Sequence, residues 1–397
     1  MKVLQINAVY GHGSTGTIVR DIEQLCEQNG IECYVASPDP KVKEAKRGYV
    51  IGNILDHKLH ALLCRINGMQ GYFSHIPTWN LCKYIDQIKP DVVHLHNLHS
   101  NYIHLNILLK HLAKRDIKTI ITLHDCWFYT GGCFHYTAVG CDRWLKGCGH
   151  CPKKKTDTPA ILFDRSSKIL ADRKEYLLAI PYLCVTGVSK WIANEAMKTF
   201  LKDTPNKVIP NGIDLTIFKP TQSDLRKRLG LEGKYVILGP ASKWLLEVNE
   251  GVLRDFTQSM KPDEVLLLFG CGQKPKGLPD NVHIYGYTKN QKELAQLYTM
   301  SDVFVNVTRE DSLSLINIEA QACGTPVVTF DATGPKETVD DIVSKSIPVG
   351  NVELLLSSVH EIRMKSNNNE LSNSFISNHY EVNTNYQKYI NLYKNKL

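Results

Sequence analysis

The chain has 397 residues, 43% hydrophobic and 22% charged, which is typical of a globular protein long enough for two domains. No stretch approaches the roughly 18–20 apolar residues of a membrane-spanning helix, so the composition predicts none. The formal net charge of +7 is mild. It fits ordinary solubility, and it also fits attraction to anionic substrates or to a lipid surface. The opening Lys2–Ala8 is typical of a buried strand rather than a signal peptide, so we expect a cytoplasmic chain.

Short apolar runs rich in β-branched residues alternate with helical patterns along the chain. This alternation predicts an α/β protein with parallel sheets that are covered on both faces. There are two sets of strands, one on each side of about residue 205, where residues 202–207 are typical of a hinge. The predicted strands are Val3–Val9, Ile31–Ala36, Val92–His96, Thr119–Leu123 and Leu183–Val188, then Tyr235–Leu238, Val265–Phe269, Val282–Ile284, Val303–Val307 and Pro326–Phe330, and the predicted helices include Thr17–Asn29, Gln291–Met300 and a final aromatic-faced helix in Tyr380–Tyr393.

The loops after the strands are where a ligand of an open α/β sheet is expected. The first strand leads into Gly11-His-Gly-Ser-Thr-Gly16, which is followed by a helix. Glycines let the backbone approach a ligand, and a helix N-terminus favours an anion. Contact of Gly13 and Ser14 with a phosphate or sugar is one reading, and a simple tight turn is the other.

Histidines gather after two later strands. His94 and His96 alternate on one strand and should point the same way, and Asn97 follows them. His124 and Asp125 come at the exit of the next apolar strand. A histidine offers donors, an acceptor and a tunable charge, so His124 is the better placed functional candidate, although a structural role is the commoner fate of a single histidine.

Five of the twelve cysteines fall between Cys126 and Cys151. A C-x2-C pair with two cysteines upstream is typical of a tetrahedral, structural zinc site in a reducing compartment. Four reduced thiols in a loop are the alternative. The surrounding aromatic residues could form a packed lid or a platform for an acceptor. The predicted ligands are Cys133, Cys141, Cys148 and Cys151.

The segment from Asp311 to Glu319 carries two carboxylates eight positions apart. Asp311 precedes the apolar periodicity, so we expect it at a helix N-terminus, with Glu319 two turns farther along. Unpaired N–H groups and the positive end of the helix dipole lie between them. The pattern indicates a ligand such as a polyol phosphate, and Lys243, at the exit of an earlier strand, could meet the phosphate.

Several motifs together carry a family resemblance. They are Ile209-Pro-Asn-Gly-Ile-Asp214, Gly286-Tyr, Tyr298-x-x-Ser-Asp302, Asp311-x7-Glu319-Ala and Ala322-Cys-Gly-Thr-Pro-Val-Val328. This string resembles the retaining, nucleotide-sugar-dependent glycosyltransferases of family 4, which have the GT-B fold. Gly13-Ser-Thr-Gly16, His124-Asp-Cys-Trp127 and the cysteine knuckle are similar to the branch that builds bacterial exopolysaccharides and capsules.

The resemblance implies two Rossmann-like domains that face each other across a cleft, with a C-terminal helix returning to the N-terminal domain. Residues 1–205 would bind the acceptor and carry a Cys-rich insertion at about 126–155. Residues 206–375 would bind the nucleotide sugar, and residues 376–397 would form the returning helix.

The resemblance also implies site roles. His124, near the anomeric centre, and Asp311, near the donor sugar, would be the catalytic residues. Glu319 would bind the ribose hydroxyls. The implied donor-binding residues are Gly13, Ser14, Asn211, Lys243, Ser312, Leu313, Ser314, Leu315 and Glu319, and the implied acceptor-binding residues are His96, Asn97 and Asp125.

The implied substrates are a UDP- or GDP-sugar donor and a glycan or lipid-linked acceptor at the inner membrane face. No catalytic metal is expected, because basic side chains and helix dipoles would neutralise the leaving diphosphate. Retention in such enzymes is ascribed to same-face attack, in which the leaving phosphate takes the acceptor proton.

Two departures from the family pattern keep alternatives open. The first acid is Asp311 followed by serine instead of glutamate followed by glycine, so Glu310 could take its role. Glu250 stands where the family has a second lysine, and a carboxylate facing a diphosphate is repulsive. A catalytically impaired GT-B protein acting as a partner or scaffold is therefore the second hypothesis. A zinc-bearing nucleic-acid binder, suggested by the cysteines and residues 153–155, is the third, and it is disfavoured because the basic residues form no stripe.

Overall fold

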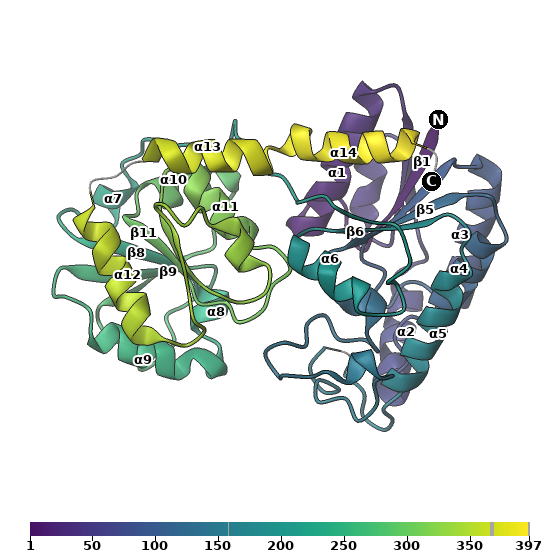
Figure 1. Ribbon diagram of the computed structural model, residues 1–397, viewed down its shortest axis with the longest axis horizontal. Coiled ribbons are helices and arrows are strands. Elements are labelled where there is room, and N and C mark those ends of the chain that lie inside the picture. The colour runs from purple at the N-terminus through teal and green to yellow at the C-terminus, as the bar shows by residue number, and fades with distance from the viewer. Residues whose placement is uncertain (158, 366–368, 396–397) are drawn as a thin grey trace. The chain divides into compact units, whose positions relative to one another are not determined.

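The chain folds into two compact units in the computed structural model, which describes residues 1–157, 159–365 and 369–395 (Figure 1). The first unit comprises Met1–Pro210 and Asn383–Leu397, and the second comprises Asn211–Val382. Each unit has one parallel sheet with helices packed around it, which confirms the predicted α/β architecture.

The sheet of the first unit has seven strands in the order β3-β2-β1-β4-β5-β6-β7. Its central strands are completely or almost completely buried, which explains why they are continuous apolar runs in the sequence. The strands are β1 (Lys2–Ile6), β2 (Glu32–Ser37), β3 (Gly48–Val50), β4 (Val92–Leu95), β5 (Lys118–Leu123), β6 (Leu183–Gly187) and β7 (Asn206–Val208).

Helices connect these strands. The first helix begins at Gly13, earlier than predicted, because its opening glycine, serine and threonine are weak helix formers that sequence periodicity does not detect. The helices of this unit are α1 (Gly13–Gln28), α2 (Ile54–Asn67), α3 (His75–Ile88), α4 (Leu105–Ala113), α5 (Ser166–Leu178), α6 (Lys190–Met197) and the final α14 (Val382–Lys394).

The final helix α14 docks on the first unit through its tyrosines, as predicted (Figure 1). Tyr386, Tyr389 and Tyr393 are all buried. The hydroxyl of Tyr389 lies 2.9 Å from Thr122 Oγ1 on β5, and that of Tyr393 lies 2.7 Å from His94 Nδ1 on β4. These tyrosines therefore combine apolar burial with satisfied hydroxyl groups.

The sheet of the second unit has six strands in the order β10-β9-β8-β11-β12-β13. The strands are β8 (Tyr235–Pro240), β9 (Glu264–Phe269), β10 (Val282–Gly286), β11 (Val303–Asn306), β12 (Val327–Phe330) and β13 (Lys345–Ile347). The helices are α7 (Leu225–Arg228), α8 (Ala241–Trp244), α9 (Glu250–Gln258), α10 (Gln291–Thr299), α11 (Leu315–Ala322), α12 (Val352–Met364) and α13 (Asn369–Tyr380).

The chain leaves the first unit later than the predicted hinge at 202–207. Asn206–Val208 is strand β7, which pairs with β6, so the division falls after Pro210. At the other end, α13 stays with the second unit, and the return begins at Asn383 instead of 376. The two passages are joined within the second unit, where Ile213 N donates to Tyr380 O and Val382 N donates to Ile213 O.

Candidate active site

The carboxyl edge of the second sheet brings together the loops after β8 and β11, because these strands are neighbours. The completely buried Asn249 joins the two loops. Its Nδ2 donates to Lys243 O (2.9 Å) and to Val307 O (3.0 Å), and its Oδ1 accepts from Arg309 Nε (2.7 Å). Sequence reasoning missed this residue, whose role depends on two loops that are far apart in the chain.

The N-terminus of α11 is built so that its backbone, and not its side chains, can meet a ligand. Ser312, Leu313 and Ser314 are buried. Ser314 is the N-cap residue, but its hydroxyl accepts from Asn306 Nδ2 at 2.9 Å instead of capping the helix. No acidic residue stands in the first turn, which leaves the positive end of the helix dipole uncompensated there.

Asp311 lies before this helix, as predicted, and hydrogen bonds fix the conformation of its loop. Its Oδ1 accepts from Ser312 N at 2.8 Å. Its carbonyl accepts from Thr333 Oγ1 (2.6 Å) and Gly334 N (3.1 Å). A side chain at Gly334 would collide with the Ser312 carbonyl, so only glycine permits this close approach.

Glu319 lies in the middle of α11, and its carboxylate is half-buried. Among the described residues, the Tyr298 hydroxyl is its only hydrogen-bond partner, at 3.0 Å. Burial raises the pKa of Glu319 to about 7, although this hydrogen bond lowers it. The carboxylate thus retains acceptor capacity for further hydroxyl groups. Tyr298 belongs to a motif quoted above, but sequence reasoning gave it no role.

Lys243, Glu250 and Asn211 complete the predictions in this unit. Lys243 lies in the short helix α8 after β8, and its ammonium has no hydrogen-bond or ion-pair partner among the described residues. Glu250 is exposed at the start of α9, where the helix dipole favours a carboxylate. Asn211 is buried, and its Oδ1 has no partner in the described part of the chain.

The carboxyl edge of the first sheet brings together the loops after β1, β4 and β5, which are also neighbours. The buried Asn7 links the first two loops, because its Oδ1 accepts from Asn97 N (3.1 Å) and its Nδ2 donates to Val9 O (2.8 Å). Gly13 has a positive φ of 61° and begins α1, where the N-cap residue His12 makes no side-chain cap. Gly13 and Ser14 are exposed there.

Three histidines form a column at this edge, and two of them, His94 and His96, are completely buried. The rings of His94 and His96 are 4.0 Å apart, which confirms that they point the same way. His96 Nδ1 lies 3.0 Å from Nε2 of His124, whose side chain is half-buried. Burial lowers the pKa of His124 to about 4 and that of His94 to about 3, so both are neutral near pH 7.

The residues assigned to acceptor binding differ in availability. His96 is completely buried, and its assignment to acceptor binding stays a prediction. Asp125 is half-buried, and its oxygens accept from Trp127 N (2.8 Å) and meet His99 Nε2 (3.0 Å). Asn97 is half-buried at the mouth of the loop after β4.

The Cys-rich insertion gives the zinc hypothesis no support. Within residues 1–157, 159–365 and 369–395, no three His, Cys, Asp or Glu residues are placed to hold a metal ion. Cys133, Cys141, Cys148 and Cys151 are all free thiols, and Cys148 Sγ accepts a hydrogen bond from Gly131 N at 3.3 Å.

Arg173 organises the start of this insertion, and sequence reasoning missed it. Its guanidinium is completely buried and lies 3.6 Å from the ring centroid of Trp127. It donates to Thr130 O at 2.6 Å and also to the Trp127 carbonyl. Trp127, Phe128 and Tyr129 are buried as well, so these aromatic residues form a packed core and not an open acceptor platform.

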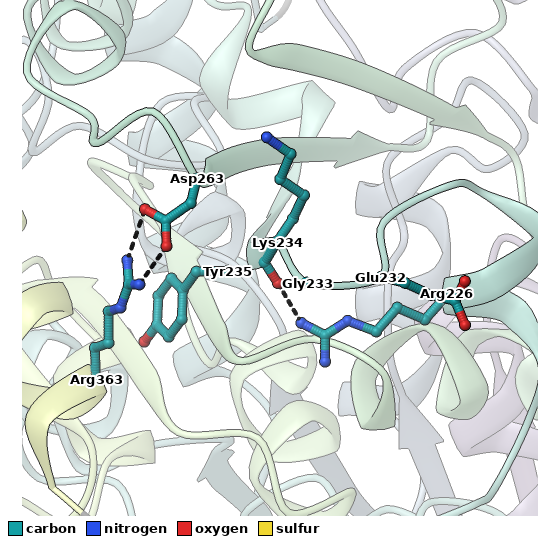
Figure 2. A pocket seen from close by; sticks show the side chains of 7 residues that line it. All are labelled: Arg226, Glu232, Gly233, Lys234, Tyr235, Asp263 and Arg363. Atoms are coloured by element: carbon teal, nitrogen blue, oxygen red, sulfur yellow. Dashed lines mark hydrogen bonds and ion pairs between the residues drawn. The ribbon is translucent and has the colours of Figure 1, made fainter.

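A separate depression of about 430 Å³ lies at the opposite, amino edge of the second sheet (Figure 2). Three of the charged residues that line it form ion pairs: Arg363 and Asp263 with each other, and Arg226 with Asp302. Arg363 pairs with Asp263 and stands over the Tyr235 ring, and Arg226 Nη2 donates to Lys234 O at 2.7 Å. This depression is away from the strand ends where ligands of such sheets bind.

Two family models match the chain. The model described as "Glycosyltransferase Family 4" matches residues 15–217, and that described as "Glycosyl transferases group 1" matches residues 256–382. WcaC of Escherichia coli (strain K12), whose name assigns it provisionally to colanic acid biosynthesis as a glycosyl transferase, is 22% identical over 362 residues, 87% of each chain.

Solved structures share the fold over nearly the whole chain. HepE of Anabaena, solved with UDP-glucose, has a TM-score of 0.67, 16% identity and 99% coverage of both chains. Sucrose-phosphate synthase of Thermosynechococcus elongatus has a TM-score of 0.68, 15% identity and coverage of 99% and 98%. The fold is therefore GT-B, as the motifs implied. Because the family model covers more than half of the chain, this protein belongs to glycosyltransferase family 4.

Proposed function

We propose that this glycosyltransferase moves a sugar from a UDP- or GDP-sugar to a glycan or lipid-linked acceptor in bacterial surface polysaccharide synthesis, with retention of the anomeric configuration. WcaC, named for colanic acid biosynthesis, and HepE, solved with UDP-glucose, support the substrate class. The observation that carries the proposal is Glu319, a half-buried carboxylate whose only described partner is one tyrosine hydroxyl.

The second unit holds the donor in this proposal. Glu319 accepts hydrogen bonds from the ribose hydroxyl groups. These bonds take the place of hydrogen bonds to water, which the half-buried carboxylate has in part lost. The backbone N–H groups of residues 312–315, at the uncompensated start of α11, bind the phosphates. Lys243, which has no partner in the described residues, contributes a positive charge from the neighbouring strand end. Asp311 and the buried Asn211 lie closer to the donor sugar than to the ribose or the phosphates.

The first unit contributes His124 and the glycine loop. His124 contacts the donor sugar near its anomeric carbon, and the exposed N-terminus of α1, with Gly13 and Ser14, faces a phosphate group. Asn97 and Asp125, at adjoining strand ends, contact the acceptor.

Charge development is met without a catalytic metal in this proposal. As the glycosidic bond to phosphate breaks, negative charge grows on the diphosphate, and Lys243 and the helix N-termini stabilise it electrostatically. The acceptor hydroxyl attacks from the face that the diphosphate leaves, and its proton passes to a leaving phosphate oxygen. The products are the glycosylated acceptor and a nucleoside diphosphate.

An exposed apolar face on α2 supports contact with a membrane surface. Ile54, Leu55, Leu59, Leu62 and Ile66 follow helical spacing and are between 41% and 73% exposed. We call these five residues the α2 face. Residues 161–163, also apolar and exposed, are tied to the end of α2 by hydrogen bonds to its last carbonyls.

The charge of this surface favours an anionic lipid bilayer. Lys58 and Arg65 are exposed on the same side of α2 as the α2 face. Apolar side chains interspersed with basic ones are typical of helices that lie in the interface of an anionic membrane. Among the described residues, no helix is long and apolar enough to cross a bilayer. We therefore propose peripheral attachment, which would bring the enzyme to a lipid-linked acceptor.

A sedimentation experiment tests the attachment. The double variant Leu59→Ser/Leu62→Ser should lose most of its binding to phosphatidylglycerol-containing vesicles, and binding of the wild type should weaken at high salt. Leu178→Ser is the matched control, because Leu178 is also an exposed leucine of the first unit but lies on α5. Equal loss in both variants would contradict a role for the α2 face.

A thermal-shift panel of UDP-, GDP- and CMP-sugars, with the free nucleotides, tests donor binding. A ligand that binds only the folded protein raises its melting temperature. We expect stabilisation by one nucleotide class and its loss in Glu319→Ala. Absence of stabilisation by every nucleotide would refute the proposed function.

A further inference from the structure

A line of hydrogen bonds runs across three neighbouring strand ends of the first unit and stops at His124. Gln5 on β1 meets His96, just after β4, with 3.2 Å between Gln5 Oε1 and His96 Nε2. His96 Nδ1 in turn lies 3.0 Å from His124 Nε2. Gln5 and His96 are both completely buried, so water does not compete for these bonds.

The backbone fixes the direction of this line. Gln5 Nε2 lies 3.0 Å from the Val19 carbonyl, which can only accept a hydrogen bond. The amide nitrogen of Gln5 must therefore face Val19, and its oxygen must face His96. Since that oxygen is an acceptor, His96 Nε2 must carry the proton.

The second step follows from neutrality. Burial holds the pKa of His96 well below its usual range, so its ring is neutral and Nδ1 is an unprotonated acceptor. The group facing that nitrogen must donate, and it is His124 Nε2. A neutral His124 that is protonated on Nε2 has a lone pair on Nδ1.

We propose that Gln5 and His96 are positioning residues that lock His124 in its Nε2-protonated tautomer, so that Nδ1 is presented to the substrate as a hydrogen-bond acceptor. Among the described residues, Nδ1 of His124 has no partner, and the ring is half-buried. The substrate group that donates a hydrogen bond to His124 Nδ1 is then a hydroxyl of the sugar or of the acceptor. It is not a phosphate oxygen, because that atom cannot donate.

The surrounding charges do not change this assignment. Burial lowers the pKa of His124 to about 4, Asp125 acts in the opposite direction, and His99 lowers it further. Asp125 is itself committed to His99 and Trp127. His94, the third ring of the column, is neutral and bonded to Thr122 and Tyr393, outside the line from Gln5.

The tautomer of His124 is measured without any substrate, so this test does not depend on the proposed function. Histidine-selective ¹⁵N labelling and long-range ¹H–¹⁵N NMR of the whole protein distinguish the two tautomers, and His124→Asn identifies the signals. We expect His124 to be Nε2-protonated and neutral between pH 6 and about 8. An Nδ1-protonated or charged ring at pH 7 would overturn the proposal.

Gln5→Leu tests the role of the line, and Tyr393→Phe is its matched control. Both remove one buried hydrogen-bond partner of a histidine in the column, but only Gln5 is connected to His124. In Gln5→Leu we expect the Nδ1-protonated tautomer of His124 to become populated. Persistence of the pure Nε2-protonated form in this variant would show that Gln5 does not position His124.

Turnover gives a second readout that rests on the proposed function. Loss of one neutral hydrogen bond in the transition state corresponds to about a fivefold lower kcat/KM for donor cleavage in Gln5→Leu. Tyr393→Phe should keep the wild-type value. An equal fall in both variants would indicate a general packing effect and contradict the positioning role, whatever the donor is.

Discussion

Glu319 makes a prediction about stability that needs no knowledge of the substrate. The rise of its pKa from 4.5 to about 7 corresponds to an upper bound of about 3 kcal/mol that opposes ionisation in the fold. Because the pKa of Glu319 is higher in the folded state than in the unfolded state, protonation of Glu319 stabilises the fold. This stabilisation is fully present below pH 4.5 and is lost as the pH rises through about 7. At pH 8 the ionised Glu319 therefore lowers the free energy of unfolding until hydrogen-bond donors of a ligand satisfy its carboxylate.

Replacement of Glu319 by glutamine removes the charge and keeps an oxygen for Tyr298. We expect the melting temperature of Glu319→Gln to exceed that of the wild type by several degrees at pH 8, with the difference shrinking at pH 5. Glu361→Gln is the control of opposite sign, because Lys345 and Lys365 lower the pKa of Glu361 to about 2. It should not be stabilised at pH 8.

Glu319→Gln should also bind nucleotide less well than the wild type. Hydrogen bonds to a charged acceptor are worth about 1.5–3 kcal/mol, so Kd should increase roughly ten- to hundredfold in calorimetry at pH 8. Ribose hydroxyl groups favour the ionised carboxylate, so wild-type affinity should rise with pH up to about 7. A stability difference that is the same at both pH values, or an unchanged Kd, would refute the reasoning about Glu319.

Three other substitutions separate binding, chemistry and architecture. His124→Ala should leave nucleotide affinity within about twofold of wild type in calorimetry but lower kcat at least tenfold, and a matching loss of affinity would place it in nucleotide binding instead. Lys243→Met should weaken nucleoside diphosphate binding and make it less sensitive to salt in titrations, and an unchanged salt dependence would remove Lys243 from the phosphate site. Arg173→Met should lower the free energy of unfolding by about 2–4 kcal/mol, because it leaves two buried carbonyl groups without a donor. It should also expose the Cys-rich insertion at about 126–155 to limited proteolysis while sparing nucleotide affinity, and a protease-resistant insertion would contradict this role.

The sequence predicts the central strands and the edge strand β10 (Val282–Gly286), and it misses the three other edge strands for a physical reason. Strands such as Val92–Leu95 are buried on both faces and therefore appear as apolar runs. The missed strands Gly48–Val50, Asn206–Val208 and Lys345–Ile347 are edge strands of three residues, and most of their side chains are partly exposed. Apolar periodicity cannot detect strands that bury so little. The misplaced domain boundary follows from the second of these omissions.

The candidate site is predictable to the extent that its residues follow strands directly. His124, Lys243 and the Asp311–Glu319 segment are all found at carboxyl ends, where a parallel sheet gathers its loops. The supporting residues are different in kind. Gln5, Asn249 and Arg173 act through contacts between segments that are distant in sequence, and none of them belongs to a local sequence motif. The cysteine spacing is a local pattern that predicts zinc, and within the described residues the fold gives it no support, because no three His, Cys, Asp or Glu side chains are placed to hold a metal ion.

The most direct test of the central claim is donor turnover by the purified protein. The nucleotide sugar that stabilises it most in the thermal-shift panel would be incubated with the enzyme, and nucleoside diphosphate release would be followed together with the anomeric configuration of the product by NMR. The account predicts release by the wild type, a product of retained configuration, and a loss of turnover in His124→Ala without a loss of binding. A protein that binds the nucleotide but releases no diphosphate from any UDP- or GDP-sugar, with glycan or lipid-linked acceptors supplied, would contradict it.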